Sequence, residues 1–345
     1  MKIALTAAFL IVVLLATGLY LQGPDWRART VQSSPIGAFP ASTAGAGEIL
    51  LQGKLAGPNK LWPLAGGEWL TGLADHRIVR FAAAGGWVQT ETIARGRPRA
   101  VQPSPGSGGF VLADSNLGLA GLRKHKPRVL SNGTTEQPAG RVMDFAIGTD
   151  GTVWYLDGSA AFGDGRAFEA LLARPADGRL LKYDGSNGET SVALDGLDLP
   201  FGLLLDERSQ SLLISEFATR RILRVQLNAP NSAEVFAASL PGYPAYLSVA
   251  PNGGVWVALY GPPMQALEAT AAYPLLREWL WRLPRWLQPR PAQRAQAVLI
   301  DAQGQLIRAV DFPSEMAPIV SVVERDGSLW MAGAEADGVL RVPLD

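Results

Sequence analysis

The stretch Asp150-Gly151-Thr152-Val153-Trp154-Tyr155-Leu156-Asp157 joins a tight turn to a short strand rich in aromatic and β-branched residues. The same order of turn residues and alternating strand recurs along the chain. The repeats are centred on Trp69, Val111, Trp154, Leu213, Trp256 and Trp330. Their spacings are 42, 43, 59, 43 and 74 residues, so three of the five match the length of one propeller blade.

The two long spacings contain insertions, at residues 160–177 and 264–294. Several repeats continue into a second strand in which Ile, Leu or Val alternates with Arg, as a half-buried antiparallel strand requires. The pattern predicts an all-β fold, a six-bladed β-propeller, with inner strands starting near Asn59, Pro98, Met143, Phe201, Ala245 and Ile319. The alternative is a β-sandwich or barrel, but those folds show turns every 8–12 residues without a period near 43.

The composition excludes several classes of protein. The chain has 345 residues, with 31 Lys and Arg against 31 Asp and Glu, so it carries no basic surplus for nucleic acid. It has no cysteine and 2 histidines, which rules out disulfides, thiol nucleophiles and zinc sites built from several Cys or His residues. Nucleotide-binding loops and a G-x-S-x-G nucleophile motif are absent from the sequence.

The N-terminus resembles a membrane or export signal. Residues 3–20 are uncharged and largely apolar, and 18 such residues fit either a short membrane span or a long signal peptide. We favour an uncleaved signal anchor, with the propeller on the periplasmic or extracytoplasmic side. A cleaved signal or a buried helix are the alternatives. The expected organisation is an anchor or signal at 1–21, a linker at 22–47 rich in Pro, Ser and Gly, and the propeller at 48–345.

Ordered motifs across residues 50–343 carry a family resemblance. They include Gly57-Pro58, Gly96-Arg97-Pro98, Gly178-Arg179-Leu180-Leu181-Lys182-Tyr183-Asp184, Arg220-Arg221-Ile222-Leu223-Arg224 and Leu240-Pro241-Gly242-Tyr243-Pro244. In these motifs the chain resembles the strictosidine synthase-like family, which includes the adipocyte plasma membrane-associated proteins, within the wider group of calcium-dependent lactonase propellers. The resemblance implies a six-bladed propeller that commonly follows a membrane anchor or signal peptide.

The resemblance implies the fold, but the residues at the family's metal-binding and catalytic positions differ in this chain. Metal-dependent relatives hold calcium in the central channel, and at the matching places this chain has Asn59, Phe201 and Ala245. Asp144 is one further oxygen ligand if it points inward, which leaves far fewer than the six to eight oxygens that calcium needs. We therefore expect no metal and no cofactor. At the place of the glutamate of the condensing enzymes the chain has Ser321, which argues against a true strictosidine synthase.

Other polar residues have ordinary structural explanations. Ser248 and Ser321 are expected in strands, and His76 and His125 in solvated turns, because no partner carboxylate is evident for either histidine. Glu216 fits the family pattern, and we interpret it as a partner of Arg220 or Arg221 at a blade edge.

The second insertion, residues 264–294, is predicted to be helical and to lie in the fifth-to-sixth blade region. It interleaves three tryptophans with arginines, which suits a lid over the channel mouth or a contact with lipid headgroups. Pro274 and Pro284 should break it into short pieces. We favour the lid, and the two interpretations are compatible if the lid faces a membrane.

The functional hypothesis is a membrane-tethered propeller whose channel mouth binds and, if the protein is an enzyme, hydrolyses a small apolar or amphipathic molecule. The expected binding residues are Asn59, Asp144, Phe201, Tyr243 and Tyr246, and no catalytic residue is assigned. If the protein is an enzyme, a hydrolase resembling lactonases or arylesterases is expected. The alternative is a non-catalytic interaction propeller with a degenerate metal site, since one scaffold carries many functions.

Overall fold

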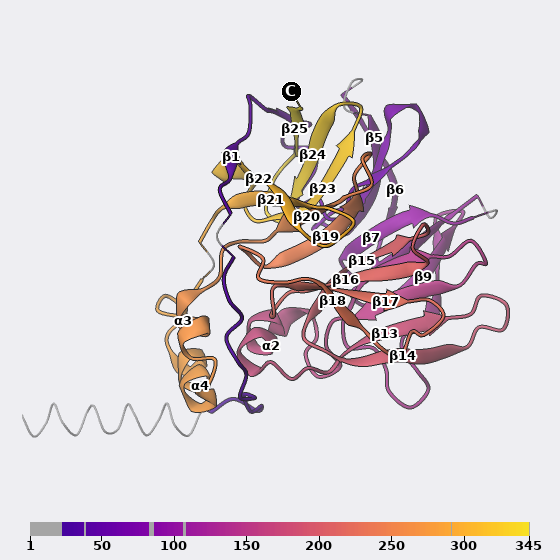
Figure 1. The fold of residues 1–345 in the computed structure, drawn as a ribbon. Coiled ribbons are helices and arrows are strands. Elements are labelled where there is room, and N and C mark those ends of the chain that lie inside the picture. The colour runs from indigo at the N-terminus through magenta and orange to yellow at the C-terminus, as the bar shows by residue number, and fades with distance from the viewer. Residues whose placement is uncertain (1–22, 38, 83–85, 106–107, 291, 345) are drawn as a thin grey trace, which may run out of the picture.

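The computed structural model describes residues 23–37, 39–82, 86–105, 108–290 and 292–344. Within these residues the strands form six sheets arranged around a central axis, so the predicted six-bladed propeller is confirmed (Figure 1). The anchor predicted at residues 3–20 lies outside the described residues. None of the helices that the structure describes is long and apolar enough to cross a membrane.

Each blade is an antiparallel sheet whose innermost strand comes first in the chain. The first three blades are β3 (Trp62–Pro63), β4 (Trp69–Gly72), β5 (Arg77–Ala82) and β6 (Trp87–Ile93); β7 (Pro98–Pro103), β8 (Phe110–Asp114), β9 (Gly118–Arg123) and β10 (Lys126–Ser131); and β11 (Val142–Ile147), β12 (Val153–Asp157), β13 (Gly178–Tyr183) and β14 (Thr190–Leu197). The fourth and fifth are β15 (Pro200–Asp206), β16 (Ser211–Glu216), β17 (Arg221–Gln226) and β18 (Glu234–Ala237); and β19 (Pro244–Val249), β20 (Val255–Leu259), β21 (Ala295–Ile300) and β22 (Leu306–Phe312). The sixth contains β23 (Ile319–Arg325), β24 (Ser328–Gly333) and β25 (Val339–Pro343).

The N-terminal part of the chain completes the ring. Strand β2 (Glu48–Leu50) pairs antiparallel with β25, so the outer strand of the sixth blade comes from the opposite end of the chain. Strand β1 (Ser42–Thr43) adds a parallel fifth strand to the fifth blade, beside β22. Because β2 covers the outer edge of β25, the backbone of β25 is not free to pair with another chain.

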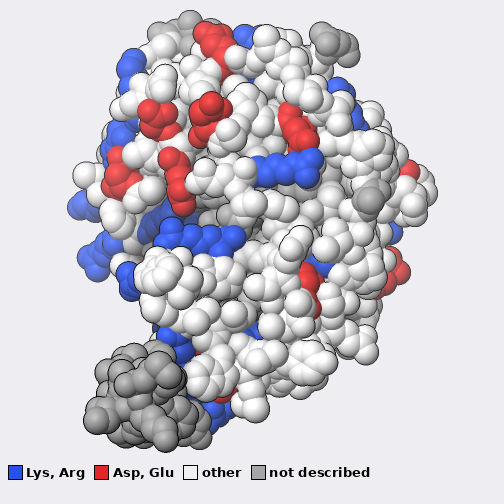
Figure 2. Space-filling model, turned by 90° about the vertical axis from the view of Figure 1, so that its left-hand side faces the viewer, with Lys and Arg blue, Asp and Glu red and all other residues white. Residues whose placement is uncertain are grey.

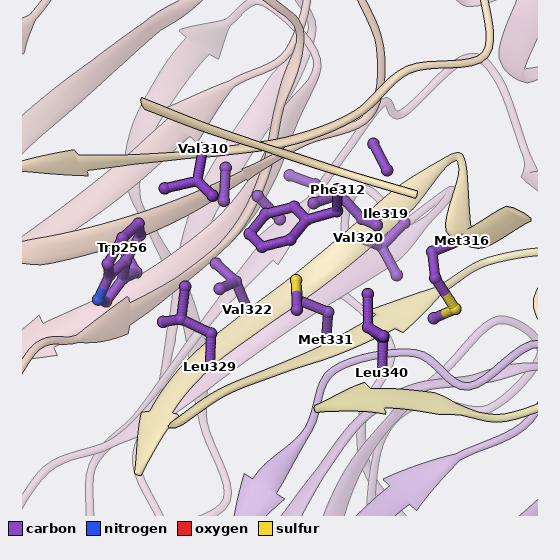
Figure 3. Packing of buried hydrophobic residues seen from close by; sticks show 14 of the residues in the cluster. Trp256, Val310, Phe312, Met316, Ile319, Val320, Val322, Leu329, Met331 and Leu340 are labelled. Carbon is purple, nitrogen blue, oxygen red and sulfur yellow. The ribbon is translucent and has the colours of Figure 1, made fainter. Parts of the chain in front are cut away.

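Alternating side chains fill the spaces between blades. In β20, Val255, Val257 and Leu259 pack toward the fourth blade, whereas Trp256 and Ala258 pack toward the sixth. Figure 3 shows the second of these clusters, where Trp256, Val310 and Phe312 meet residues of the sixth blade. Since successive residues of a strand face opposite sides, each blade is buried on both faces, and its neighbours supply the core.

The inner strands begin at or near the predicted residues, and five of them begin irregularly. The pairing register shifts at the start of β7, β11, β15, β19 and β23. A bulge of this kind redirects one or two side chains away from the regular ladder. The bulged residues therefore face the end of the channel where the inner strands start.

Both insertions lie at that same end of the propeller, because each connects the second strand of a blade to the third. The first contains the 3₁₀ turn η2 (Asp164–Arg166) and helix α2 (Ala167–Ala173). The second lies within the fifth blade, between β20 and β21, and its helical part is smaller than expected. It contains only α3 (Gln265–Ala269) and α4 (Pro274–Arg282), because Pro274 can only start a helix and the chain turns extended at Leu283, just before Pro284.

The segment predicted as a linker lies against the propeller. Trp26 packs into the apolar cluster formed by the insertions, and the Val31 amide donates to the Ala271 carbonyl oxygen. Further along, the Gly37 amide donates to the Ser239 carbonyl oxygen. In Figure 1 this indigo segment runs alongside α2, α3 and α4. It ties the insertions to the propeller before it reaches β1 and β2.

Candidate functional site

A cavity of about 380 Å³ opens where the inner strands begin. Its floor and walls come from the starts of inner strands, from the loops beside them and from both insertions. Its lining residues are Asn59, Arg97, Arg99, Arg141, Met143, Gly158, Asp164, Ala167, Phe168, Leu171, Leu199, Pro200, Phe201, Phe217, Tyr260, Met264, Val320 and Ala334. This volume lies within the usual range for small-molecule sites. A larger, polar hollow between the second and third blades is lined by turns and outer strands, including residues 129–135, and it has no comparable aromatic wall.

The irregular starts of the inner strands supply part of this lining. Arg99, Met143, Phe201 and Val320 lie at the register shifts of four blades, and all four line the cavity. The local cause is the break in the ladder, which frees these side chains to face the axis. Positions that recur in the repeat therefore supply part of the cavity lining. Residues of the two insertions supply another part.

One wall of the cavity is aromatic. Phe217 stacks on Phe201 at a ring distance of 5.8 Å and on Tyr243 at 4.8 Å, with an angle of 7° between the latter two rings. Tyr260 meets Phe217 edge to face at 5.6 Å. Phe168 of α2 adds a further ring to the lining. Stacked rings that support one another make a rigid apolar surface for a ring or an acyl chain.

Another part of the lining is basic, and we call it the basic wall. Arg99 and Arg141 share the carboxylate of Asp164, with 3.2 Å between Arg141 Nε and Asp164 Oδ1. The Arg97 Nη2 group donates to the Ala334 carbonyl oxygen at 3.3 Å. Three guanidinium groups thus face a single carboxylate among the lining residues that the structure describes.

The pKa values reflect this crowding. Burial, together with the nearby charge of Arg99, lowers the pKa of Arg141 to about 10. Burial acts to raise the pKa of Asp164, but Arg99 and Arg141 outweigh it and hold the pKa below its usual value. Arg141 and Asp164 therefore stay charged near neutral pH, and the arginines of this wall outnumber its carboxylate.

A buried ion pair lies deeper in the channel. Lys60 Nζ donates to both carboxylate oxygens of Asp144, at 2.8 and 2.7 Å, and to the Leu203 carbonyl oxygen at 3.2 Å. The Phe145 and Leu203 amides also donate to Asp144, at 2.9 and 2.7 Å. Burial raises the pKa of Asp144, and Lys60 and these two amides oppose the rise. Four donated hydrogen bonds therefore satisfy a carboxylate that has no access to water.

The channel residues do not fit a calcium ion. The ammonium group of Lys60 sits against Asp144, where a divalent cation would have to bind. The Asn59 side chain donates its Nδ2 hydrogen to the Pro98 carbonyl oxygen at 3.1 Å. Phe201 and Ala245 offer no oxygen donors from their side chains, and a hard cation needs several. No group of three or more His, Cys, Asp or Glu side chains suited to a metal occurs among the described residues.

The structure places the five predicted binding residues at two depths. Asn59 and Phe201 line the cavity. Tyr243, Tyr246 and Asp144 lie behind it: Tyr243 supports Phe217, and Tyr246 donates its hydroxyl hydrogen to the Arg99 carbonyl oxygen at 3.0 Å. Burial raises the pKa of Tyr246 well above its usual range, so its phenol stays neutral. These three residues shape and hold the lining and are not part of its surface.

Other residues singled out in the sequence have structural partners. Glu216 is buried and pairs with Arg221, while it accepts the Asp198 amide hydrogen at 2.8 Å. Ser321, in β23, accepts the Leu61 amide hydrogen at 3.1 Å, and Ser248, in β19, donates to the Val322 carbonyl oxygen at 2.6 Å. The interpretation of these residues as structural is confirmed.

The basic wall was not predicted from the sequence. Arginines at the strand starts could have indicated it, because Arg97 and Arg99 flank the first residue of β7, and Arg141 immediately precedes β11. Arginines therefore occupy corresponding positions at the starts of two consecutive blades. Asp164 carried no such signal, because it comes from an insertion that follows no repeat.

Comparison with known proteins supports the family resemblance. The strictosidine synthase family model matches residues 141–230, which span the third blade and the first three strands of the fourth. The adipocyte plasma membrane-associated protein of Bos taurus is 29% identical over 373 residues, covering 98% of this chain and 89% of the relative. The resemblance to the strictosidine synthase-like family is confirmed. A strictosidine synthase-like 13 protein of Arabidopsis thaliana is 26% identical over 70% of this strictosidine synthase-like chain and 68% of its own length.

Solved structures agree with the propeller fold. A gluconolactonase from Xanthomonas campestris superposes with a TM-score of 0.63 at 15% identity, covering 94% of this strictosidine synthase-like chain and 98% of its own. The calcium-binding protein regucalcin of Agrobacterium tumefaciens gives a TM-score of 0.61 at 13% identity, with coverage of 89% and 96%. At these identities the likeness supports the fold and not the chemistry.

Proposed function

We propose that this strictosidine synthase-like propeller binds a small amphipathic molecule at the mouth of its channel, beside a membrane. The observation that carries the proposal is the cavity of about 380 Å³, whose lining combines an aromatic wall with a basic one. Phe168, Phe201, Phe217 and Tyr260 would hold a ring or a short acyl chain, and the basic wall would orient it.

Binding is better supported than hydrolysis. The ionisable side chains that line the cavity in the described part of the chain are arginines, Asp164 and Tyr260, and no histidine, serine or glutamate joins them. Asp164 is held by two arginines, which lowers its pKa and makes it a poor proton acceptor. The fold is shared with a gluconolactonase, but the metal-dependent activation of water that such a channel could offer has no matching ligand set here.

A ligand-binding experiment tests the proposal. The full chain in amphipol would be titrated calorimetrically with short amphipathic compounds that carry an octyl or a phenyl group. Replacing Phe168 by Ala should weaken binding about ten-fold, because a ring contact is lost. The control is Ile93→Ala, which truncates a side chain that is 68% exposed on an outer strand. If no compound binds, the protein is better described as an interaction propeller.

The membrane part of the proposal rests on helix α4, which buries charged side chains and exposes apolar ones. Arg277 and Glu278 face inward and are 2% exposed, whereas Leu275 and Trp279 face outward at 69% and 41%. Trp286, shortly after the helix, is 77% exposed. Soluble proteins normally turn the apolar face of a helix inward, so this arrangement suits contact with lipid.

The start of the described chain supports the same orientation. Trp26 meets Trp281 edge to face at 6.5 Å, and Arg27 pairs with Glu278 at 2.9 Å. The first described residues of the chain therefore lie against α4. Figure 2, which views the side of the molecule that bears α3 and α4 in Figure 1, shows a mostly uncharged lower surface with basic side chains at its margins. This distribution resembles that of interfacial helices, where aromatic rings and arginines share the headgroup layer.

Quenching by brominated lipids tests the orientation. In liposomes that contain the full chain, such lipids should quench the fluorescence of Trp279 and Trp286, and the quenching should fall when both are replaced by Phe. Trp87→Phe is the control, because Trp87 lies in β6, an outer strand of the first blade. Equal quenching in the double variant and the control would contradict the contact.

A further inference from the structure

The basic wall of the cavity has more positive charge than it needs for its own structure. Arg97, Arg99 and Arg141 face Asp164, and three cations against one anion leave two positive charges. Lys60 does not change this surplus, because it is paired with Asp144 deeper in the channel. Arg99 is buried and Arg97 and Arg141 are half-buried, and charges that lose part of their hydration are costly unless they are paired, so this surplus requires an explanation.

The guanidinium groups also keep unused hydrogen-bond donors. The Nε atoms of Arg97 and Arg99 are buried and make no hydrogen bond to any residue that the structure describes. Arg141 Nε lies 3.2 Å from Asp164 Oδ1, so this carboxylate is shared by two guanidinium groups. Buried donors without acceptors and crowded cations both cost stability, and an anion bound at this wall would offset that cost through its charge.

The surroundings help to fix these arginines in place. Arg99 Nη2 pairs with Asp164, and the Arg97 backbone amide donates to Ser115 Oγ at 2.8 Å. Arg99 itself is only 8% exposed. Donors that are held in position lose little entropy when a ligand binds, and guanidinium groups match the planar oxygens of carboxylates and the oxygens of phosphates.

We propose that Arg97, Arg99 and Arg141 form an anion subsite that takes the carboxylate or phosphate group of an amphipathic ligand, with its apolar part on the aromatic wall. This inference rests on the proposed binding function and adds the chemical class of the ligand. The acidic head lies between the arginines, and the ring or acyl chain extends toward Phe168 and Phe217. Uncharged molecules of the same shape leave the arginine donors unsatisfied, so they bind more weakly.

The test compares ligands that differ only in the head group. Octanoate, octyl phosphate, octanol and octylamine would be titrated into the full chain in amphipol, with protein-free amphipol as the blank. We expect octanoate or octyl phosphate to bind about ten- to hundred-fold more tightly than octanol, because each charge-assisted hydrogen bond adds to affinity. Octylamine should bind most weakly, and the tighter of the two anions identifies the head group.

Variants locate the effect. Arg141→Gln should remove most of the preference for octanoate over octanol, and Arg141→Lys should restore part of that preference, because Lys keeps the charge and loses the planar fork. The control is Arg128→Gln, the same change on an exposed position of β10. The comparison of ligands on the unaltered chain needs no variant, so it stands even if Arg141→Gln fails to fold.

Each outcome has a distinct meaning. If octanol binds as tightly as octanoate, the anion subsite is refuted and the binding function remains. The subsite is also refuted if octanoate binds tightly but Arg141→Gln and Arg99→Gln do not alter its affinity, since the anion must then lie elsewhere. If none of the octyl compounds binds, the proposed function fails and the subsite fails with it.

Discussion

Replacing Lys60 by Met probes the buried ion pair between Lys60 and Asp144 in the channel. The substitution keeps much of the side-chain volume but removes the ammonium group from two carboxylate oxygens and one carbonyl oxygen. Asp144 is 0% exposed, so its charge would remain without a counter-ion. Breaking a buried pair in this way typically destabilises a protein by about 3–5 kcal/mol.

Protonation of Asp144 sets a ceiling on the free energy of unfolding that the variant can lose through the unpaired charge. A carboxylate that cannot stay charged can take up a proton, and holding an Asp of unfolded pKa near 3.9 protonated costs about 1.4 kcal/mol for each pH unit above that value. The ceiling on the charge penalty is then about 4 kcal/mol at pH 7 and about 1.5 kcal/mol at pH 5. The amides of Phe145 and Leu203 still stabilise the charged form, so the measured loss should fall somewhat below the ceiling at pH 7.

The sign of the pH dependence follows from the direction of the shift. In Lys60→Met the folded-state pKa of Asp144 lies above its unfolded value, because burial already raises it and the opposing ammonium is gone. The proton then stabilises the folded state at low pH, and this contribution is lost as the pH rises through the folded-state pKa. The destabilisation should therefore grow from pH 5 to pH 8.

Denaturant unfolding, followed by tryptophan fluorescence at several pH values, measures this effect. The matched control is Lys60→Met with Asp144→Asn, which removes both charges but keeps an oxygen acceptor for only one of the two amides. This double variant should recover part of the lost stability and show no added pH dependence. A single variant that is as stable as the unaltered protein at pH 7, or whose loss does not grow with pH, would refute the reasoning.

Three further predictions concern the channel, the ring and the N-terminus. Calorimetry should detect no tight calcium binding, and Phe201→Asn with Ala245→Asp should raise calcium affinity chiefly when Lys60→Met is added, because the ammonium otherwise repels the ion; strong binding by the unaltered chain would contradict this. A chain that starts after β2 should unfold at lower denaturant concentration and self-associate through the freed edge of β25, unlike one that starts at Gly45 and keeps β2; equal behaviour of the two would show that β2 does not close the ring. If residues 3–20 stay attached as an anchor, the protein should remain with membranes after carbonate extraction, whereas a mature N-terminus near Leu19 would identify a cleaved signal.

The sequence by itself determined the architecture of this protein. Strand alternation is a local property, and the turn-and-strand repeat around Trp154, Trp256 and Trp330 has a period that only a few folds can accommodate. The starts of the inner strands followed from the same repeat, which is why Asn59 and Phe201 could be placed at the channel mouth. The local sequence pattern predicts these strands because every blade packs against its neighbours in the same way.

Only the tertiary structure decided what the channel contains. Lys60 and Asp144 are 84 residues apart, and nothing local to either one shows that the ammonium group of one satisfies the buried carboxylate of the other. Likewise, Asp164 joins the arginines of two other strand starts because an insertion folds back over the mouth, and α4 turns its apolar side outward because Arg277 and Glu278 find partners inside. These choices depend on which distant groups meet and are desolvated together, and a one-dimensional repeat does not encode such pairings.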